Sequence, residues 1–182
     1  MAAPHPIRPA TAADVPALAA LKRATFYETF VEGFAIPYPP ADRARFEADT
    51  YGEATVAAEI ADPAHATWVV EGPDGALVAY AHVGPCKLPH GDVRTGELEL
   101  YQLYMLQGQQ GGGLGRALME RALGWMEGRS SRDSGSGRIW LGVWSGNLRA
   151  QRFYDRFGFR QVGDYHFAVG DHRDQEFILR RD

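Results

Sequence analysis

The chain has 182 residues, and we expect it to form a single domain over residues 1–182. Its 45% hydrophobic and 23% charged residues suit a globular protein, and its formal net charge of −4 argues against binding to nucleic acid or an anionic membrane. Cys86 is the only cysteine, which excludes an intrachain disulfide. Together with the absence of a signal peptide or membrane-span pattern, this predicts a cytoplasmic protein.

The first third of the chain predicts one short strand followed by helices. Thr11 and Asp14 form the capping pair of a helix start, and Gly33 with the prolines after it ends the helical pattern. The expected elements are a strand at 7–10, a helix at 14–30, a second at 41–50, and a third at 55–61 that is separate from the second or continuous with it.

A dense group of aromatic residues lies around the end of the first helix. Its members are Phe26, Tyr27, Phe30, Phe34 and Tyr38. Two interpretations stay open, namely a core with one exposed ring, or one wall of a substrate pocket to which Phe26, Tyr27 and Phe30 contribute.

The remaining two thirds predict alternating strands and helices. The turn at 72–75 indicates a hairpin, and the apolar run at 138–144 indicates a central strand. A Ser/Gly-rich stretch at 129–137 indicates a flexible connection. The expected strands are 67–71, 76–84, 97–105, 138–144, 159–169 and 175–180, and the expected helices are 113–128 and 147–157, the latter ended by Gly158.

A strand, a glycine loop and a helix follow one another over residues 97–120. The loop contains Gly108, Gly111, Gly112, Gly113 and Gly115. Backbone N–H groups at a helix start have no partner within the helix, and glycines allow a phosphate to approach them. We therefore expect residues 110–116 to hold a pyrophosphate or a similar dianion. A flexible glycine turn is the alternative, and the run matches neither the dinucleotide fingerprint nor the Walker loop.

Two blocks of the sequence resemble the GCN5-related N-acetyltransferase (GNAT) family. The first is Gln110-x-x-Gly113-x-Gly115 directly after an apolar strand. The second, within 140–159, combines Asn147, Ala150, Phe153-Tyr154 and Gly158-Phe159. The resemblance covers about half of the chain, and residues 157–179 also look similar to bacterial polyamine acetyltransferases of the spermidine/spermine type.

The resemblance implies an α/β (α+β) GNAT fold, with a mixed, mostly antiparallel sheet of about seven strands, helices on both faces and a splayed strand pair. It implies acetyl-CoA (coenzyme A) as co-substrate, with the pantetheine arm between strands 97–105 and 138–144 and the diphosphate on the loop. The implied cofactor-binding residues are Leu103, Tyr104, Met105, Gln110, Gly111, Gly112, Gly113, Leu114, Gly115, Arg116, Asn147 and Ala150. Gly112 stands where relatives commonly have Lys or Arg, and Arg116 is a candidate to compensate.

The resemblance also implies direct attack of a primary amine on the thioester, with Tyr154 as general acid and Glu99 as general base or water-orienting carboxylate. Glu97 and Tyr101 are expected on the face of Glu99, because strand side chains repeat every two residues. His82 is a candidate for the acceptor pocket. The structural alternatives are solvated glutamates, a core tyrosine and a structural histidine. The histidines show no metal-ligand spacing, so we expect no metal site.

An acetyl-CoA-dependent N-acetyltransferase is therefore the favoured function. A non-catalytic acyl-CoA-binding or sensing module and a nucleotide-binding enzyme are the alternatives. A polyamine, an amino acid, an aminoglycoside and a protein N-terminus all stay open as acceptors. The sequence does not determine the oligomeric state, although many members of the family form homodimers.

Overall fold

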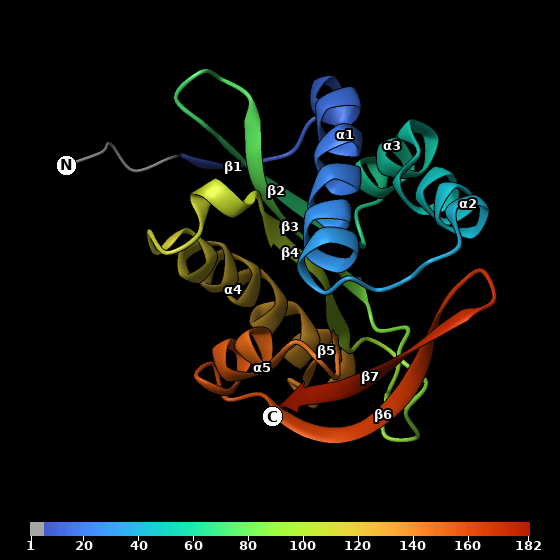
Figure 1. Cartoon of the computed structure of the whole chain (residues 1–182). Coiled ribbons are helices and arrows are strands. Elements are labelled where there is room, and N and C mark those ends of the chain that lie inside the picture. Colours follow the sequence, from blue (N-terminus) through green and yellow to red (C-terminus); the bar gives the residue numbers. More distant parts are fainter. Residues whose placement is uncertain (1–5) are drawn as a thin grey trace.

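A computed structural model describes residues 6–182, without the side chains of 131–134. It contains a sheet with helices on both faces (Figure 1). The strands are β1 Ile7–Pro9, β2 Ala66–Glu71, β3 Leu77–Pro85, β4 Leu98–Met105, β5 Ile139–Trp144, β6 Arg160–Val169 and β7 His172–Arg181. The helices are η1 Ala12–Asp14, α1 Val15–Phe26, η2 Tyr27–Gly33, α2 Pro40–Tyr51, α3 Glu53–Ala61, η3 Gln107–Gln109, α4 Leu114–Ser134 and α5 Leu148–Asp155. Within this described part, every helix is too short or too polar to cross a membrane.

The seven strands form one sheet in the order β1-β2-β3-β4-β5-β7-β6. Every neighbouring pair is antiparallel except β4 and β5, which run parallel. Parallel neighbours need a crossover connection, and α4 supplies it. The predicted mixed, mostly antiparallel sheet is confirmed.

The pairing between β4 and β5 is short. Only three residues of β4, Leu98 to Leu100, pair with Ile139 to Leu141. Beyond them β4 stays paired with β3 as far as Met105, and β5 stays paired with β7 as far as Trp144. The two halves of the sheet therefore diverge from Leu100 onward, which confirms the expected splay.

Different helices cover the two faces of the sheet (Figure 1). On one face, the α4 residues Leu118, Met119, Ala122 and Met126 are fully buried in the largest hydrophobic cluster. On the other face, α1 and α3 pack against alternate residues of the same strands, such as Val69 and Tyr80. Alternate strand residues point to opposite faces, so the strands contribute apolar side chains to both layers.

The structure corrects two predicted boundaries. The stretch at 129–137 is not a flexible connection, because α4 continues to Ser134 and ends at Gly135 in the left-handed conformation (φ 71°). Extending a helix that is already nucleated costs little, and Arg129 packs 4.2 Å above the Trp125 ring. The expected helix at 14–30 is α1 followed by a π-helical turn, η2, which extends to Gly33.

We expect Leu118→Ala to lower the free energy of unfolding by about 2–5 kcal/mol, because Leu118 is 0% exposed and the deletion leaves a cavity between α4 and the sheet. Urea unfolding measures the loss. Leu148→Ala is the matched control, because Leu148 is 58% exposed and should change stability by about 0.5 kcal/mol or less. Equal losses in both variants would contradict the assignment of Leu118 to the core.

Candidate active site

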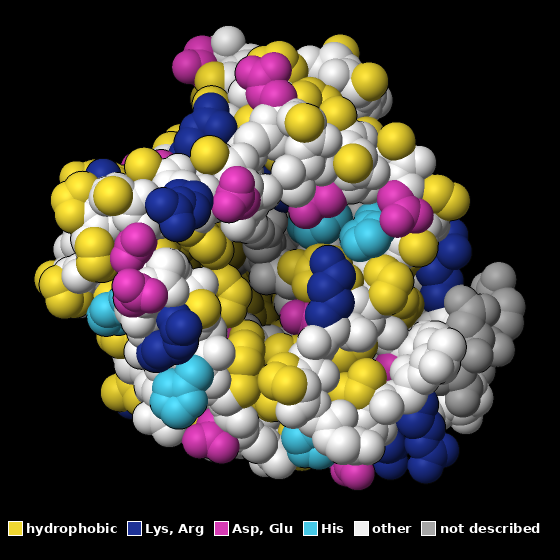
Figure 2. Space-filling model, turned by 90° about the vertical axis from the view of Figure 1, so that its right-hand side faces the viewer, with side chains coloured by type: hydrophobic (Ala, Val, Ile, Leu, Met, Phe, Trp, Pro, Cys, Tyr) yellow, Lys and Arg dark blue, Asp and Glu magenta, His cyan; other side chains and the backbone are white. Residues whose placement is uncertain are grey.

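A cavity of about 1290 Å³ opens where β4 and β5 diverge. Figure 2 shows this hollow, with hydrophobic side chains in its walls and acidic, basic and histidine side chains around its mouth. The glycine loop lies at one end of the cavity and the aromatic residues of η2, α2 and β6 lie at the other. Residues from both halves of the sheet therefore face a common space.

The loop before α4 has the geometry of an anion site. Gly113 is the N-cap of α4 and has a left-handed backbone (φ 83°). The first hydrogen bond of the helix runs from Ala117 N to Gly113 O, so the N–H groups of residues 114–116 precede the helical ladder. A Cβ at Gly111, Gly112 or Gly113 would meet nothing within 4 Å, so a ligand has room to reach the backbone. This geometry is that of an anion site, and the binding of a dianion by residues 110–116 stays a prediction.

The other glycine of the motif serves packing. A Cβ at Gly115 would lie 2.9 Å from Cε of Met105, so its absence allows α4 to approach β4 closely. Gly111, Gly113, Gly115, Gln110 and Arg116 line the cavity, while Gly112 and Leu114 are not among its lining residues.

Two arginines lie near the loop. Arg116 is exposed and pairs with Glu120 one helical turn later, at 2.8 Å. Arg149 lines the cavity from α5 and donates a hydrogen bond to Oε1 of Gln110, at 2.6 Å. The sequence analysis missed Arg149, and its position two residues after Asn147 was the available signal. Arg149 supplies a cation near the loop where Gly112 lacks one.

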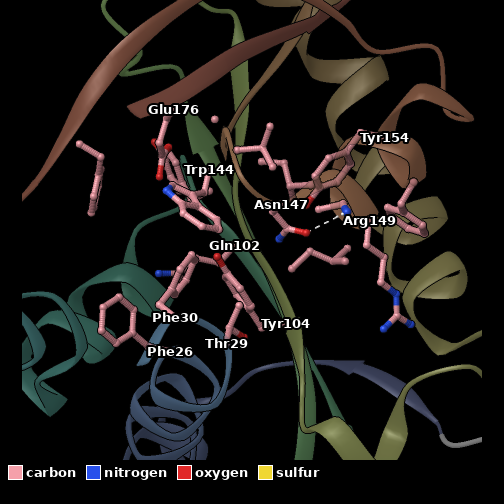
Figure 3. Close-up of a pocket in the computed structure, with 18 of the residues that line it drawn as sticks. Phe26, Thr29, Phe30, Gln102, Tyr104, Trp144, Asn147, Arg149, Tyr154 and Glu176 are labelled. Carbon is pink, nitrogen blue, oxygen red and sulfur yellow. Dashed lines mark hydrogen bonds between the residues drawn. The ribbon is translucent and has the colours of Figure 1, made fainter. Parts of the chain in front are cut away.

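The start of α5 brings Asn147 and Tyr154 to the cavity (Figure 3). Oδ1 of Asn147 accepts a hydrogen bond from Ala150 N at 3.0 Å and caps the helix, so the amide nitrogen remains as the donor. The half-buried Tyr154 ring packs against Phe153 and Phe159, which agrees with the core interpretation, while its side chain also lines the cavity. Burial and the nearby charge of Glu176 raise the pKa of Tyr154, so its hydroxyl stays protonated at neutral pH.

A buried carboxylate, Glu99, and a partly buried one, Glu176, lie at the other side of the opening. Glu99 is 8% exposed and accepts a hydrogen bond from Lys87 N at 2.8 Å. Burial raises its pKa to about 7, and the charge of Glu176 acts in the same direction. Burial also raises the pKa of Glu176 to about 6, although Tyr165 donates a hydrogen bond to it at 2.7 Å. The sequence analysis missed Glu176, which directly precedes the apolar residues Phe177 to Leu179 of β7.

A β-bulge in β4 decides which side chains share a face with Glu99. Leu100 pairs with Val83 and Gln102 with His82, so Tyr101 is an extra residue between them. Past this bulge Leu103 and Met105 join the cluster under α4, whereas Tyr104 packs toward α1. Leu103, Tyr104 and Met105 all line the cavity along the edge of β4 that β5 has left.

Glu97 does not share the position of Glu99. It precedes β4, is 1% exposed, and accepts hydrogen bonds from Trp140 Nε1 at 2.7 Å and Arg94 N at 3.1 Å. Its carboxylate therefore serves the fold around Trp140, outside the cavity. Trp140 pairs with Glu99 across β4 and β5, so Glu97, which bonds Trp140, lies on the predicted face of the sheet but is not among the cavity-lining residues.

Aromatic side chains form the far wall of the cavity. Phe26 and Phe30 line it with their ring centroids 5.2 Å apart, and the rings of Phe34 and Trp144 are tilted against each other with their centroids 4.5 Å apart. Tyr27 is 40% exposed, lies under Arg43 and is not among the lining residues, so its predicted substrate contact gains no support. A helix turns by about 100° per residue, which places Tyr27 off the face that carries Phe26 and Phe30.

His82 lies in a polar network beside this wall. It is 1% exposed, its Nδ1 is 2.8 Å from Oγ1 of Thr67, and its ring stacks on His65. Fully buried Lys22 pairs with Glu59 at 2.6 Å next to it. Burial, and then the charge of Lys22, hold the pKa of His82 well below its usual range, so His82 is neutral. Among the described residues, no acidic, cysteine and histidine side chains cluster as metal ligands would.

Several known proteins are similar to this chain in sequence or in fold. An uncharacterized N-acetyltransferase of Lactobacillus delbrueckii subsp. lactis is 29% identical over 92% of this chain and 91% of its own. Streptothricin acetyltransferase of Streptomyces lavendulae is 30% identical over 72% of this chain and 66% of its own. The structure of the PaiA N-acetyltransferase of Thermoplasma acidophilum in complex with coenzyme A superposes with a TM-score of 0.70 at 17% identity, over 97% of this chain and 98% of that one.

The family model described as "Acetyltransferase (GNAT) family" matches residues 23–159, which is most of the chain and includes both motif blocks. Members of this family use acetyl-CoA as the acetyl donor. The chain therefore belongs to the GNAT family and is an acetyl-CoA-dependent N-acetyltransferase.

Proposed function

We propose that the enzyme acetylates a small-molecule primary amine by direct attack on the thioester of acetyl-CoA, with residues 1–182 acting as one catalytic domain. The observation that carries this proposal is the opening of the sheet beyond Leu100. The glycine loop lies at one end of the opening, and the carboxylates of Glu99 and Glu176 lie at the other.

The cofactor would lie along the opening. Its pantetheine amides would pair with the open edge of β4 at Leu103, Tyr104 and Met105, as an added strand does. Its diphosphate would bind the N–H groups of residues 111–116, with Gln110 and Arg149 beside them. Asn147 would donate its amide nitrogen to the arm, and the small side chain of Ala150 would leave room for it.

Proton transfer determines the roles at the reacting centre. The amine arrives as an ammonium and must lose a proton before attack. Glu99, assisted by Glu176, would accept this proton directly or through water, since their raised pKa values of about 7 and about 6 suit a base near neutral pH. The amine nitrogen then bonds to the acetyl carbon, a backbone N–H stabilises the oxyanion, and the C–S bond breaks. The Tyr154 hydroxyl would protonate the departing thiolate and would recover a proton, through water, from the nitrogen, which loses its second proton as the amide forms.

The charge and shape of the acceptor end favour a cationic small molecule. The carboxylates of Glu99, Asp174 and Glu176 line this end, against the single lining cation Lys87 among the described residues there, while a fourth carboxylate, Glu59, is paired with Lys22. The aromatic wall offers ring faces that attract an ammonium. The match to a streptothricin acetyltransferase supports a small-molecule acceptor over a protein.

Thiol release from acetyl-CoA with a panel of amines tests the proposal. Cofactor binding without turnover on any amine would favour a non-catalytic sensing module.

Tyr154→Phe should lower kcat by about 10²-fold and leave the affinity for acetyl-CoA nearly unchanged, because it removes one hydroxyl proton and keeps the packed ring. Steady-state kinetics and calorimetric binding measure the two quantities. Tyr27→Phe is the control, because Tyr27 lies outside the cavity. Loss of cofactor binding in Tyr154→Phe would identify Tyr154 as a packing residue instead.

Glu99 can accept a proton only when it is ionised, so kcat/KM should rise as the pH rises through about 7. Glu99→Gln should remove this limb, lower turnover at neutral pH, and leave only a limb near 6 from Glu176. The exposed Glu53 of α3 provides the control Glu53→Gln, with the wild-type profile expected. A pH–rate profile that Glu99→Gln leaves unaltered would exclude Glu99 from the proton route.

Gly113→Asp should weaken CoA binding by about tenfold relative to Gly113→Asn, because the carboxylate would face the diphosphate on the helix start. The asparagine variant carries the same left-handed backbone strain without the charge. Calorimetry with CoA compares the two. Equal affinities would place the diphosphate elsewhere.

A further inference from the structure

Two polar atoms in the acceptor end of the cavity have no hydrogen-bond partner among the described residues. They are Nε2 of His82 and Oε1 of Gln102, and both are buried. Buried polar groups in proteins almost always have a partner, so two orphans that line one cavity indicate groups that a ligand or water completes. Neither atom belongs to the cofactor slot or to the proton route described above.

The two orphans lie side by side. His82 and Gln102 are directly paired residues of β3 and β4, so their side chains share one face of the sheet. Glu59 of α3 faces the same space, and its Oε1 is 3.6 Å from Nε2 of His82, too far for a good hydrogen bond. The other oxygen of Glu59 is occupied by Lys22. We call Glu59, His82 and Gln102 the polar subsite.

The polar subsite is close to the reacting centre. Gln102 lies three residues after Glu99 on β4, and Figure 3 shows its side chain between Tyr104 and Trp144, facing the gap where Asn147 lies. A group bound there would be joined to the reacting amine by a short chain of atoms.

The charges around the polar subsite select against a second ammonium. Lys22 is fully buried beside Glu59 and neutralises it, and Lys87 lies 4.4 Å above the ring of Tyr101, which packs against His82. Burial lowers the pKa of His82 most, and the charges of Lys22 and Lys87 act in the same direction. The imidazole is neutral, and the oxygens of Gln102 and Glu59 can accept hydrogen bonds from N–H or O–H groups.

We propose that the polar subsite binds an uncharged hydrogen-bonding group, a hydroxyl or a carboxamide, carried by the acceptor a few atoms from its reacting amine. Gln102 and His82 are then specificity-determining residues of the acceptor site. The inference rests on the proposed acetyl transfer for the identity of the ligand as an amine. Its occupant is water when no acceptor is bound.

The test uses the full chain saturated with CoA and matched linear primary amines. These differ only in the far end group, which is methyl, hydroxyl, carboxamide or ammonium, and each is taken at several chain lengths. Calorimetry should give hydroxyl- or carboxamide-bearing amines a dissociation constant at least about tenfold lower than those of the methyl and ammonium counterparts of equal length.

Gln102→Leu should abolish this advantage, because it removes the accepting oxygen and keeps a side chain of similar size. Gln102→Met tests the same point if the leucine variant does not fold. Gln161→Leu, at an exposed glutamine of β6, should keep the wild-type selectivity.

Four results would overturn the inference. They are equal affinities for all end groups, tighter binding of the ammonium compounds, selectivity that survives Gln102→Leu, and no binding of any hydroxyl- or carboxamide-bearing amine. Acetylation assays of the same compounds separate the two proposals. Selective binding without turnover would contradict the proposed function and leave the polar subsite standing, while turnover without selectivity would do the reverse.

Discussion

The separation of β4 from β5 is the constraint on which the rest of the structure depends. Backbone N–H and C=O groups in the middle of a sheet normally satisfy each other, and leaving them unpaired costs free energy unless another partner takes their place. Here three residues of β4 pair with three of β5. Beyond them, β4 pairs only with β3 and β5 pairs only with β7. A ligand that ran between them would complete the ladder, as we propose for the pantetheine arm of the cofactor.

The same opening sets the electrostatics of the site. Carboxylates in the wall of this cavity are partly removed from water, which disfavours their charged form and raises their pKa. Glu99 and Glu176 come from opposite halves of the sheet, and each has a raised pKa mainly because of burial. The glycine loop offers backbone N–H groups to negative charge at the other end. The cavity thus separates backbone N–H groups at one end from carboxylates at the other.

The N-terminal helices connect these two ends. The π-helical turn η2 carries Phe30 and Phe34 into the aromatic wall, and π-helical turns often occur at functional sites. In the same turn, Oε2 of Glu28 accepts a hydrogen bond from Gln107 N at 3.0 Å, just before the glycine loop. The wall of the acceptor pocket is therefore anchored to the segment that would bind the diphosphate.

The sequence by itself determined the family, the sheet class and the positions of Gly113, Asn147 and Tyr154, because glycine spacing, helix capping and strand patterns are local signals. Only the tertiary structure decided which side chains meet in the cavity. The bulge at Tyr101 interrupts the alternation of side chains along β4, so Glu99, Gln102 and Tyr104 lie on the same side of the sheet. Strand β7 places Glu176, from near the end of the chain, in the same cavity. The tertiary structure also brings Glu97 into a hydrogen bond with Trp140 and places Tyr27 outside the cavity. These outcomes depend on pairing register and on contacts between distant segments, which no local pattern encodes.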